Sequence, residues 1–226
     1  MDFSAMFQTW LNVLTKPNEA TFEQERHNPR ASLTTAIIWM AIAAVAAAIF
    51  SALGSVIGSF IGGSAALLSP ELLESADLPP EVAAQLAGFM VQGGVGIGFS
   101  FCLILIIPIG FLLSSAIYFG AAKIVGGSGS FEEQSYLLAT FIAPLTIVSY
   151  VANVIPILGA CVSCLIGLYQ LVLTYFALKT AHSLTSGSAV LAVVIAIVIW
   201  IVLAICLVAV PLFFLGGLIA AGSSGS

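Results

Sequence analysis

The sequence predicts an all-α, polytopic integral membrane protein: a bundle of five transmembrane helices with an N-terminal amphipathic interfacial helix. Three observations predict this class. Of 226 residues, 61% are hydrophobic and only 7% are charged, whereas soluble domains carry about 25% charged residues. Five apolar runs are long enough to cross a bilayer, and every Lys and Arg lies outside the middle of these runs. A chain with so little charge cannot cover a water-facing surface, so lipid is its expected solvent.

The apolar runs cover roughly residues 33–62, 95–122, 136–155, 159–178 and 189–220. The third and fourth have about twenty residues each, which is enough for about 30 Å of hydrocarbon at the rise of a helix. The others are longer and must tilt or project into the interface. The expected organisation is therefore an N-terminal segment (1–32), a five-span membrane domain (33–222) and a Gly/Ser tail (223–226).

The basic residues predict an orientation. Lys16, Arg26 and Arg30 precede the first run, Lys123 follows the second, and Lys179 follows the fourth. With an odd number of spans these segments share one side, which the positive-inside rule makes the cytoplasm. We therefore expect a multi-pass protein of the cell membrane, with a cytoplasmic N-terminus and an external C-terminus. No cleavable signal peptide is expected, because the N-terminus lacks a basic start.

The loop between the first two runs is acidic. Within SPELLESADLPPEVAAQ, Ser69 before Pro70 predicts the start of a short helix. We interpret its carboxylates as a solvated surface, with an external cation site as the alternative. They are Glu71, Glu74, Asp77 and Glu81. The net charge of −5 also argues against a nucleic-acid partner, which requires a basic face.

The N-terminal stretch FSAMFQTWLNVL carries apolar residues at helical spacing. Such a face is typical of a helix that lies in the headgroup boundary or docks against a bundle. Pro17 is expected to end the helix. The residues of the apolar face are Phe3, Met6, Phe7, Trp10, Leu11 and Leu14.

The stretch GGSGSFEEQSY (126–136) separates the second and third runs. A phosphate-binding loop would need a lysine and a hydroxyl after the glycines, but Phe131 and two glutamates follow Ser130 here. The spacing from Ser130 to Glu133 instead fits a capping box. We therefore predict that the glycines form a flexible turn and that SFEE begins the helix of the third span.

No ionisable residue lies in the middle of a predicted span, which argues against ion-coupled transport. The four cysteines lie in apolar runs and are interpreted as small buried hydrophobes. No catalytic, cofactor or metal site is predicted. Hydrogen-bonding residues in the third and fourth runs either join helices or line a polar cavity for a lipid headgroup or another small ligand. This candidate cluster comprises Tyr150, Asn153, Tyr169 and Gln170.

An ordered set of residues extends over most of the chain. It comprises Trp10, Val13, Leu14, Pro17 and Phe22, then Gly126-Gly127 with Ser130-Phe131, Pro144, Pro156 and Gly159, and finally Tyr169, Leu173, Leu178 and Lys179. In this set the chain resembles the Yip family of Ypt/Rab-interacting proteins (Yip-one domain), in its compact prokaryotic-type form. The resemblance implies five spans and a cytoplasmic N-terminus. Eukaryotic members of the family bind prenylated Rab-type GTPases, but they tend to have a longer N-terminal region.

The expected function is that of a non-enzymatic membrane-organising or protein-interaction component, with a passive channel or permease for a small solute as the alternative. Its expected partners are the lipid bilayer and either another membrane protein or a second copy of the chain. The candidate partner surface lies on the side that carries the basic residues. It comprises Phe3, Phe7, Trp10 and Phe131.

Overall fold

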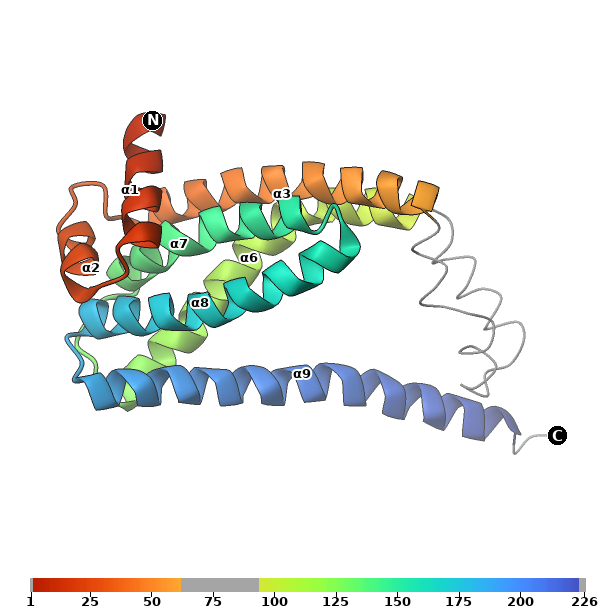
Figure 1. Cartoon of the computed structure of the whole chain (residues 1–226). Helices are drawn as coiled ribbons and strands as arrows, with labels where there is room; N and C mark the ends of the chain where they lie inside the picture. The colour runs from red at the N-terminus through yellow and green to blue at the C-terminus, as the bar shows by residue number, and fades with distance from the viewer. Residues whose placement is uncertain (1, 62–93, 224–226) are drawn as a thin grey trace.

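The computed structural model describes residues 2–61 and 94–223, and this part of the chain is helical throughout. Two short helices, α1 (Phe3–Thr15) and α2 (Glu19–Arg26), precede five long ones. These are α3 (Leu33–Ile61), α6 (Gly94–Ile124), α7 (Phe131–Ala152), α8 (Pro156–His182) and α9 (Ser186–Ser223), numbered as in Figure 1. All five are long and apolar enough to cross a membrane. The predicted polytopic helical fold is therefore confirmed.

The span boundaries agree with the apolar runs to within a few residues. The third span begins earlier than its apolar run, because the polar residues from Phe131 onward form its first turn. The predicted helix start at Ser69 and the acidic residues of the 69–84 loop lie outside the described residues.

Helix α7 lies at the centre of the bundle. It contacts α3 and α8, while α6 packs on α3, and α9 packs on α6 and α8. One apolar cluster joins α7 to α1, α2, α3 and α8; it includes Trp10, Phe22, Trp39, Tyr136 and Phe141. A second cluster joins α6, α8 and α9 through small side chains, among them Ala121, Ala192 and Ala196. Small residues let helix backbones approach closely, which is the usual source of helix association in lipid.

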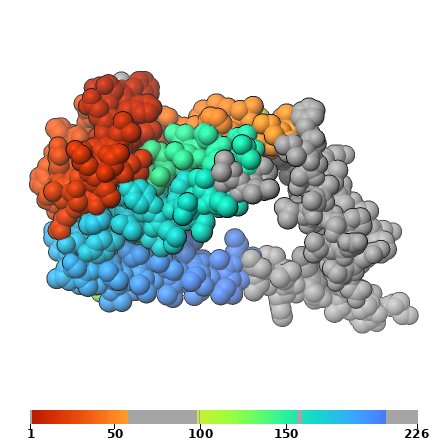
Figure 2. Space-filling model, viewed as in Figure 1, coloured from red at the N-terminus to blue at the C-terminus, as the bar shows by residue number. Residues whose placement is uncertain are grey.

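The two short helices lie across one end of the bundle, next to the α6–α7 and α8–α9 connections (Figure 1). In the space-filling view they cover the upper part of this end and meet α8 (Figure 2). Each has a side-chain cap: Asp2 accepts from the amide of Ala5 at 3.2 Å, and Asn18 accepts from the amide of Thr21 at 2.9 Å. All five Lys and Arg residues belong to the segments gathered here, so we call it the basic end.

Candidate functional site

The α6–α7 connection, Val125–Ser130, is the first component of the basic end. Ser130 Oγ accepts from the amide of Glu133 at 3.2 Å, and Glu133 Oε2 accepts from the amide of Ser130 at 3.4 Å. This reciprocal pair is the predicted capping box, which is confirmed. It satisfies two backbone donors at the start of α7, and it places two glutamates where the helix dipole favours negative charge.

The glycines of this connection do not form the free turn that the sequence suggested. A Cβ atom at Gly129 would lie 2.0 Å from the carbonyl oxygen of Ala181, and one at Gly127 would lie 2.9 Å from the His182 side chain. The amide of Ser128 donates to the carbonyl of His182 at 3.2 Å. The connection is therefore packed backbone to backbone against the end of α8, an approach that only glycine permits. The prediction of a flexible turn was wrong because sequence shows the glycines but not the neighbour that requires them.

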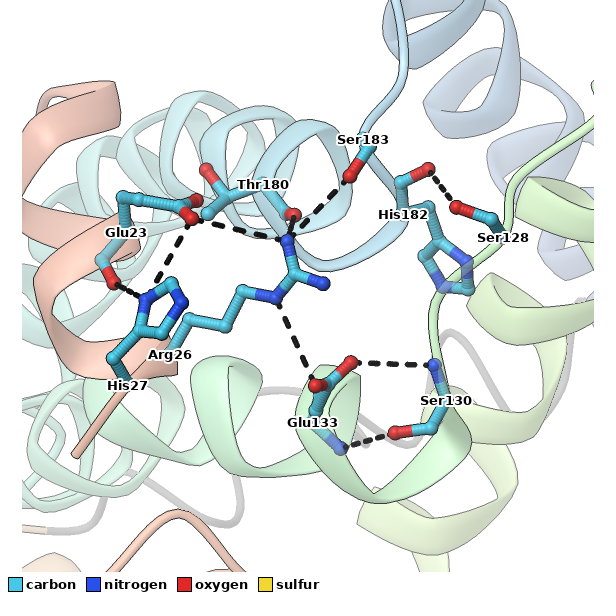
Figure 3. Close-up of polar contacts among 9 residues, drawn as sticks. All are labelled: Glu23, Arg26, His27, Ser128, Ser130, Glu133, Thr180, His182 and Ser183. Carbon is cyan, nitrogen blue, oxygen red and sulfur yellow. Dashed lines mark hydrogen bonds and ion pairs between the residues drawn. The ribbon is translucent and has the colours of Figure 1, made fainter. Parts of the chain in front are cut away.

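Arg26 of α2 contacts both α7 and α8 at this end (Figure 3). Its Nη1 donates to the carbonyl of Thr180 at 3.1 Å, among the last carbonyls of α8, and its Nε lies 3.8 Å from Glu133 Oε1. A second ion pair joins Lys179 of α8 to Glu19 of α2 at 2.5 Å. These contacts attach the N-terminal segment to the membrane domain. Arg26 also gives a second donor to a helix-end carbonyl, which otherwise accepts only from the amide of Ser183 at 3.4 Å.

Behind this surface lies a buried polar network joining α6, α7 and α8. Gln134 Nε2 donates to the carbonyl of Ser115 at 2.8 Å, and Gln134 Oε1 lies 2.8 Å from His182 Nε2. Ser115 and Ser135 share a hydroxyl hydrogen bond at 2.6 Å. Because Gln134 Oε1 accepts, His182 Nε2 must carry a proton. His182 ends α8, is 1% exposed and serves as an interhelical hydrogen-bond partner.

The four residues proposed as a partner surface fall into different environments. Phe3 and Phe7 are 59% and 56% exposed, whereas Trp10 is 4% exposed and packs edge-on against Trp39 of α3. Phe131 is part-buried and packs edge-on against Phe119 of α6. Trp10 therefore holds α1 to the bundle in this structure, and Phe3 and Phe7 remain available on the outside.

The apolar face predicted for α1 is thus divided in two. Met6, Trp10 and Val13 are buried against the bundle. Phe3, Phe7 and Leu11, spaced four residues apart, form an exposed stripe that we call the apolar flank. The sequence could not separate these sets, because both are apolar and they lie on adjacent faces of one helix.

The candidate polar cluster of the third and fourth spans is not one site. Tyr169 donates its hydroxyl to the carbonyl of Leu14 at the end of α1 at 2.5 Å. Asn153 lies in the α7–α8 turn and donates to Ser163 Oγ at 3.0 Å. Tyr169 follows Pro156 by thirteen helical residues, about 20 Å along α8, so these two contacts are far apart. Tyr150 and Gln170 are part-buried. The interhelical hydrogen bonds of Asn153 and Tyr169 support the interpretation that these groups join helices.

All four cysteines have exposed side chains, and none forms a disulfide. The prediction that they are buried inside the protein was wrong. An apolar run in a membrane protein contains residues that face lipid as well as residues that face other helices, and both positions favour a small hydrophobe. Within residues 2–61 and 94–223, no three His, Cys, Asp or Glu side chains gather as a metal site would require.

Glu25 of α2 is a component of this end that the sequence did not reveal. Its side chain is buried, and its Oε2 accepts from the hydroxyl of Tyr136 at 3.2 Å. Nothing in the polar string EATFEQER distinguishes Glu25 from its neighbours Glu19 and Glu23, which are exposed. Only the position of α2 against α7 identifies it.

Comparison with known proteins gives one match. The model of the family described as Yip1 domain matches residues 11–210. No curated protein and no solved structure matches the chain. The family match covers most of the chain, from the last turn of α1 into α9, and includes the whole basic end except the first turns of α1. The five spans, the capped third span and the family match agree, and the chain belongs to the Yip1-domain family.

Proposed function

We propose that this protein is a non-enzymatic membrane-organising component that acts through its basic end, which lies at the cytoplasmic face. The observation that carries the proposal is the apolar flank of α1. Phe3, Phe7 and Leu11 are each more than half exposed, while the rest of α1 is fixed to the bundle through Trp10 and its neighbours. A helix held rigidly at the membrane boundary with aromatic side chains exposed is suited to enter one leaflet.

The position of the flank favours lipid over water. Helix α1 crosses the direction of the spans, and α2 lies on its outer side, farther from the middle of the bundle (Figure 1). The polar face of α1, with Gln8 and Asn12, lines a cleft shared with α2. At about 100° per residue, Phe3 and Phe7 lie on a different face from these polar residues, whereas Leu11 lies between the two faces and also lines the cleft. This arrangement supports a placement in which the polar face points outward and the apolar flank points toward the hydrocarbon.

The depth of α1 in the bilayer can be measured, and this tests its proposed position at the interface. In a variant lacking the four cysteines, a fluorophore attached through Phe7→Cys should be quenched by lipids brominated on their acyl chains. The matched control is Gln8→Cys, one residue away on the polar face, where quenching should be weak. Equal quenching at the two positions would contradict an interfacial α1.

Vesicle shape tests the function. Cryo-electron microscopy of proteoliposomes measures the vesicle diameters. With the native chain the diameters should be smaller or less variable than with the Phe3→Ser, Phe7→Ser, Leu11→Ser variant. The control carries Ser4→Ala and Ala20→Ser, at exposed positions that do not line the cleft between α1 and α2, and should behave as the native chain. Identical vesicles with and without the apolar flank would overturn a membrane-organising role. If that variant instead loses a co-purifying membrane protein, a protein-interaction role is favoured, and solute flux through native proteoliposomes would favour the channel alternative.

Cysteine labelling tests the orientation. In the same cysteine-free background, Ser128→Cys lies in the connection at the basic end, and Val154→Cys lies in the α7–α8 turn at the opposite end of the bundle. An impermeant reagent added outside intact cells should label Val154→Cys only. Labelling of Ser128→Cys from outside would place the basic end externally and contradict the positive-inside expectation.

A further inference from the structure

Glu25 is a buried carboxylate with an unusual set of partners. The side chain is 5% exposed. Three neutral donors converge on its Oε2: the hydroxyl of Thr9 at 3.4 Å, the hydroxyl of Tyr136 at 3.2 Å and the amide of Asn28 at 3.1 Å. Within the described residues no Lys, Arg or His forms an ion pair with Glu25, and Oε1 receives no hydrogen bond. Buried carboxylates are normally paired with a cation, so Glu25 lacks the partner that its burial calls for.

Glu25 also lines a cleft between α1 and α2. The cleft has a volume of about 580 Å³, which is within the range of about 300–1,000 Å³ for small-molecule sites. Its walls are mostly polar side chains of α1, α2 and the segments that follow them, with Ala5 and Leu11 as the apolar exceptions. Lys16 and Arg30 line it as well. Lys16 forms no ion pair within the described residues, and Arg30 pairs with Asp2 at 3.7 Å in an exposed position. Such an exposed pair is weak and can exchange for another anion.

This charge arrangement specifies a ligand chemistry. A carboxylate oxygen in the cleft suits a hydrogen-bonding ammonium, and the two basic side chains suit a phosphate. A single inorganic cation would satisfy Glu25 but would be repelled by Lys16 and Arg30. A zwitterion that carries both a primary amine and a phosphate satisfies all three groups.

The location favours a lipid as the source. Helix α1 supplies polar wall residues of the cleft on one face and Phe3 and Phe7 of the apolar flank on another, with Leu11 of the flank at the cleft itself. A helix at the interface places its polar face at the level of the headgroups. We propose that the cleft binds the headgroup of an aminophospholipid, with the ammonium against Glu25 and the phosphate against Lys16 and Arg30. The lipid source rests on the interfacial position of α1 proposed above, whereas the amine–phosphate chemistry rests on the cleft alone.

The competing explanation is purely structural. Through Thr9 and Tyr136, Glu25 connects α1, α2 and α7, and it could serve only to fix the N-terminal segment to the bundle. The two explanations differ in what Glu25→Gln does. Glutamine retains the size and an acceptor oxygen but cannot neutralise an ammonium, so the structural contacts are largely kept while the proposed selectivity is removed.

Lipid retention by the full chain tests the proposal. The protein in detergent is exchanged into an equimolar mixture of phosphatidylethanolamine, phosphatidylcholine and phosphatidylglycerol, and bound lipid is identified by native mass spectrometry. Phosphatidylethanolamine should be retained preferentially, because the choline headgroup has no N–H donor and the glycerol headgroup has no cation. Glu25→Gln should lower this retention about tenfold, as expected for the loss of one charge-assisted hydrogen bond. Glu23→Gln, with the same charge change on the exposed side of α2, should leave it unchanged.

A second variant keeps the test decisive if Glu25→Gln fails to fold. Lys16→Gln removes an exposed side chain without an ion pair in the described part of the chain and should lower phosphatidylethanolamine retention several-fold. Retention in proportion to the mixture, or equal retention by native chain, Glu25→Gln and Glu23→Gln, would overturn the proposal. A lower unfolding midpoint for Glu25→Gln with unchanged lipid selectivity would establish the structural explanation.

Calorimetry with free O-phosphoethanolamine tests whether the ligand is a lipid or a free amine–phosphate compound. If the free compound binds as tightly as the lipid, the lipid assignment is overturned.

Discussion

Helices α7 and α9 are both long enough to span a membrane, but they occupy opposite environments. The most apolar stretch of α7 has a mean hydropathy of 1.7 and is 56% buried within the protein, whereas that of α9 has a mean hydropathy of 3.4 and is 17% buried. The more hydrophobic helix is therefore the more exposed one. In water the order would be reversed, but lipid is as apolar as a leucine side chain, so hydrophobicity does not drive a span into the bundle.

Polar groups explain the interior position of α7. Gln134, Ser135 and Tyr136 in its first turns are buried and hydrogen-bonded to α6, α8 and α2. Unpaired polar groups are costly in hydrocarbon, so these residues require neighbouring helices. Helix α9 instead packs through alanines on α6 and α8 and exposes branched apolar side chains. Substitutions matched between the two helices can test this contrast.

The largest contrast is expected for leucine truncation. Leu138 of α7 is 1% exposed and Leu191 of α9 is 52% exposed. Leu138→Ala should lower the free energy of unfolding by about 2–5 kcal/mol, because it leaves a cavity in the core. Leu191→Ala should change it by less than about 0.5 kcal/mol. Unfolding in mixed micelles with increasing SDS, followed by circular dichroism, measures both, and equal losses would contradict the assignment of α9 as the lipid-facing helix.

A smaller difference in stability is expected when a glycine is replaced by alanine at the start of each helix. Gly129 lies just before α7 against the Ala181 carbonyl, whereas a Cβ atom at Gly187, in the first turn of α9, meets nothing within 4 Å. Gly129→Ala should therefore destabilise the protein by about 1–3 kcal/mol through overpacking. Gly187→Ala should be neutral or slightly stabilising, because alanine favours the helix. The same unfolding assay applies, and an unaffected Gly129→Ala would mean that the connection can move away from α8.

The smallest contrast concerns the polar network. Gln134→Leu leaves His182 Nε2 and the Ser115 carbonyl without their partner and should cost about 1–2 kcal/mol. Gln170 of α8 is part-buried and has no hydrogen-bond partner in the described residues, so Gln170→Leu is the control and should cost nothing measurable. Ser115→Ala combined with Gln134→Leu gives a double-mutant cycle. Strict additivity in that cycle would show that the network is not coupled.

Local signals explain why much of the basic end could be predicted. The capping box depends on Ser130 and Glu133, three residues apart, so the sequence contains all of it. The gathering of the basic residues follows from the parity of five spans. By contrast, the burial of Trp10, the close approach at Gly129 and the role of His182 depend on contacts between segments distant in the chain. For the same reason, the candidate cluster of Tyr150, Asn153, Tyr169 and Gln170 could not be recognised as separate contacts.

The sequence by itself determined that the chain is a helical membrane protein, how many spans the described part contains and, to within a few residues, where each lies. The reason is that these features depend on composition and on spacing within a segment. Only the tertiary structure decided which span lies at the centre, which flank of α1 remains exposed and which glutamate is buried. In lipid the inner and outer faces of a span are both apolar, so the choice between them is made by interhelical packing and hydrogen bonds, and the partners in those contacts are known only once the helices are assembled.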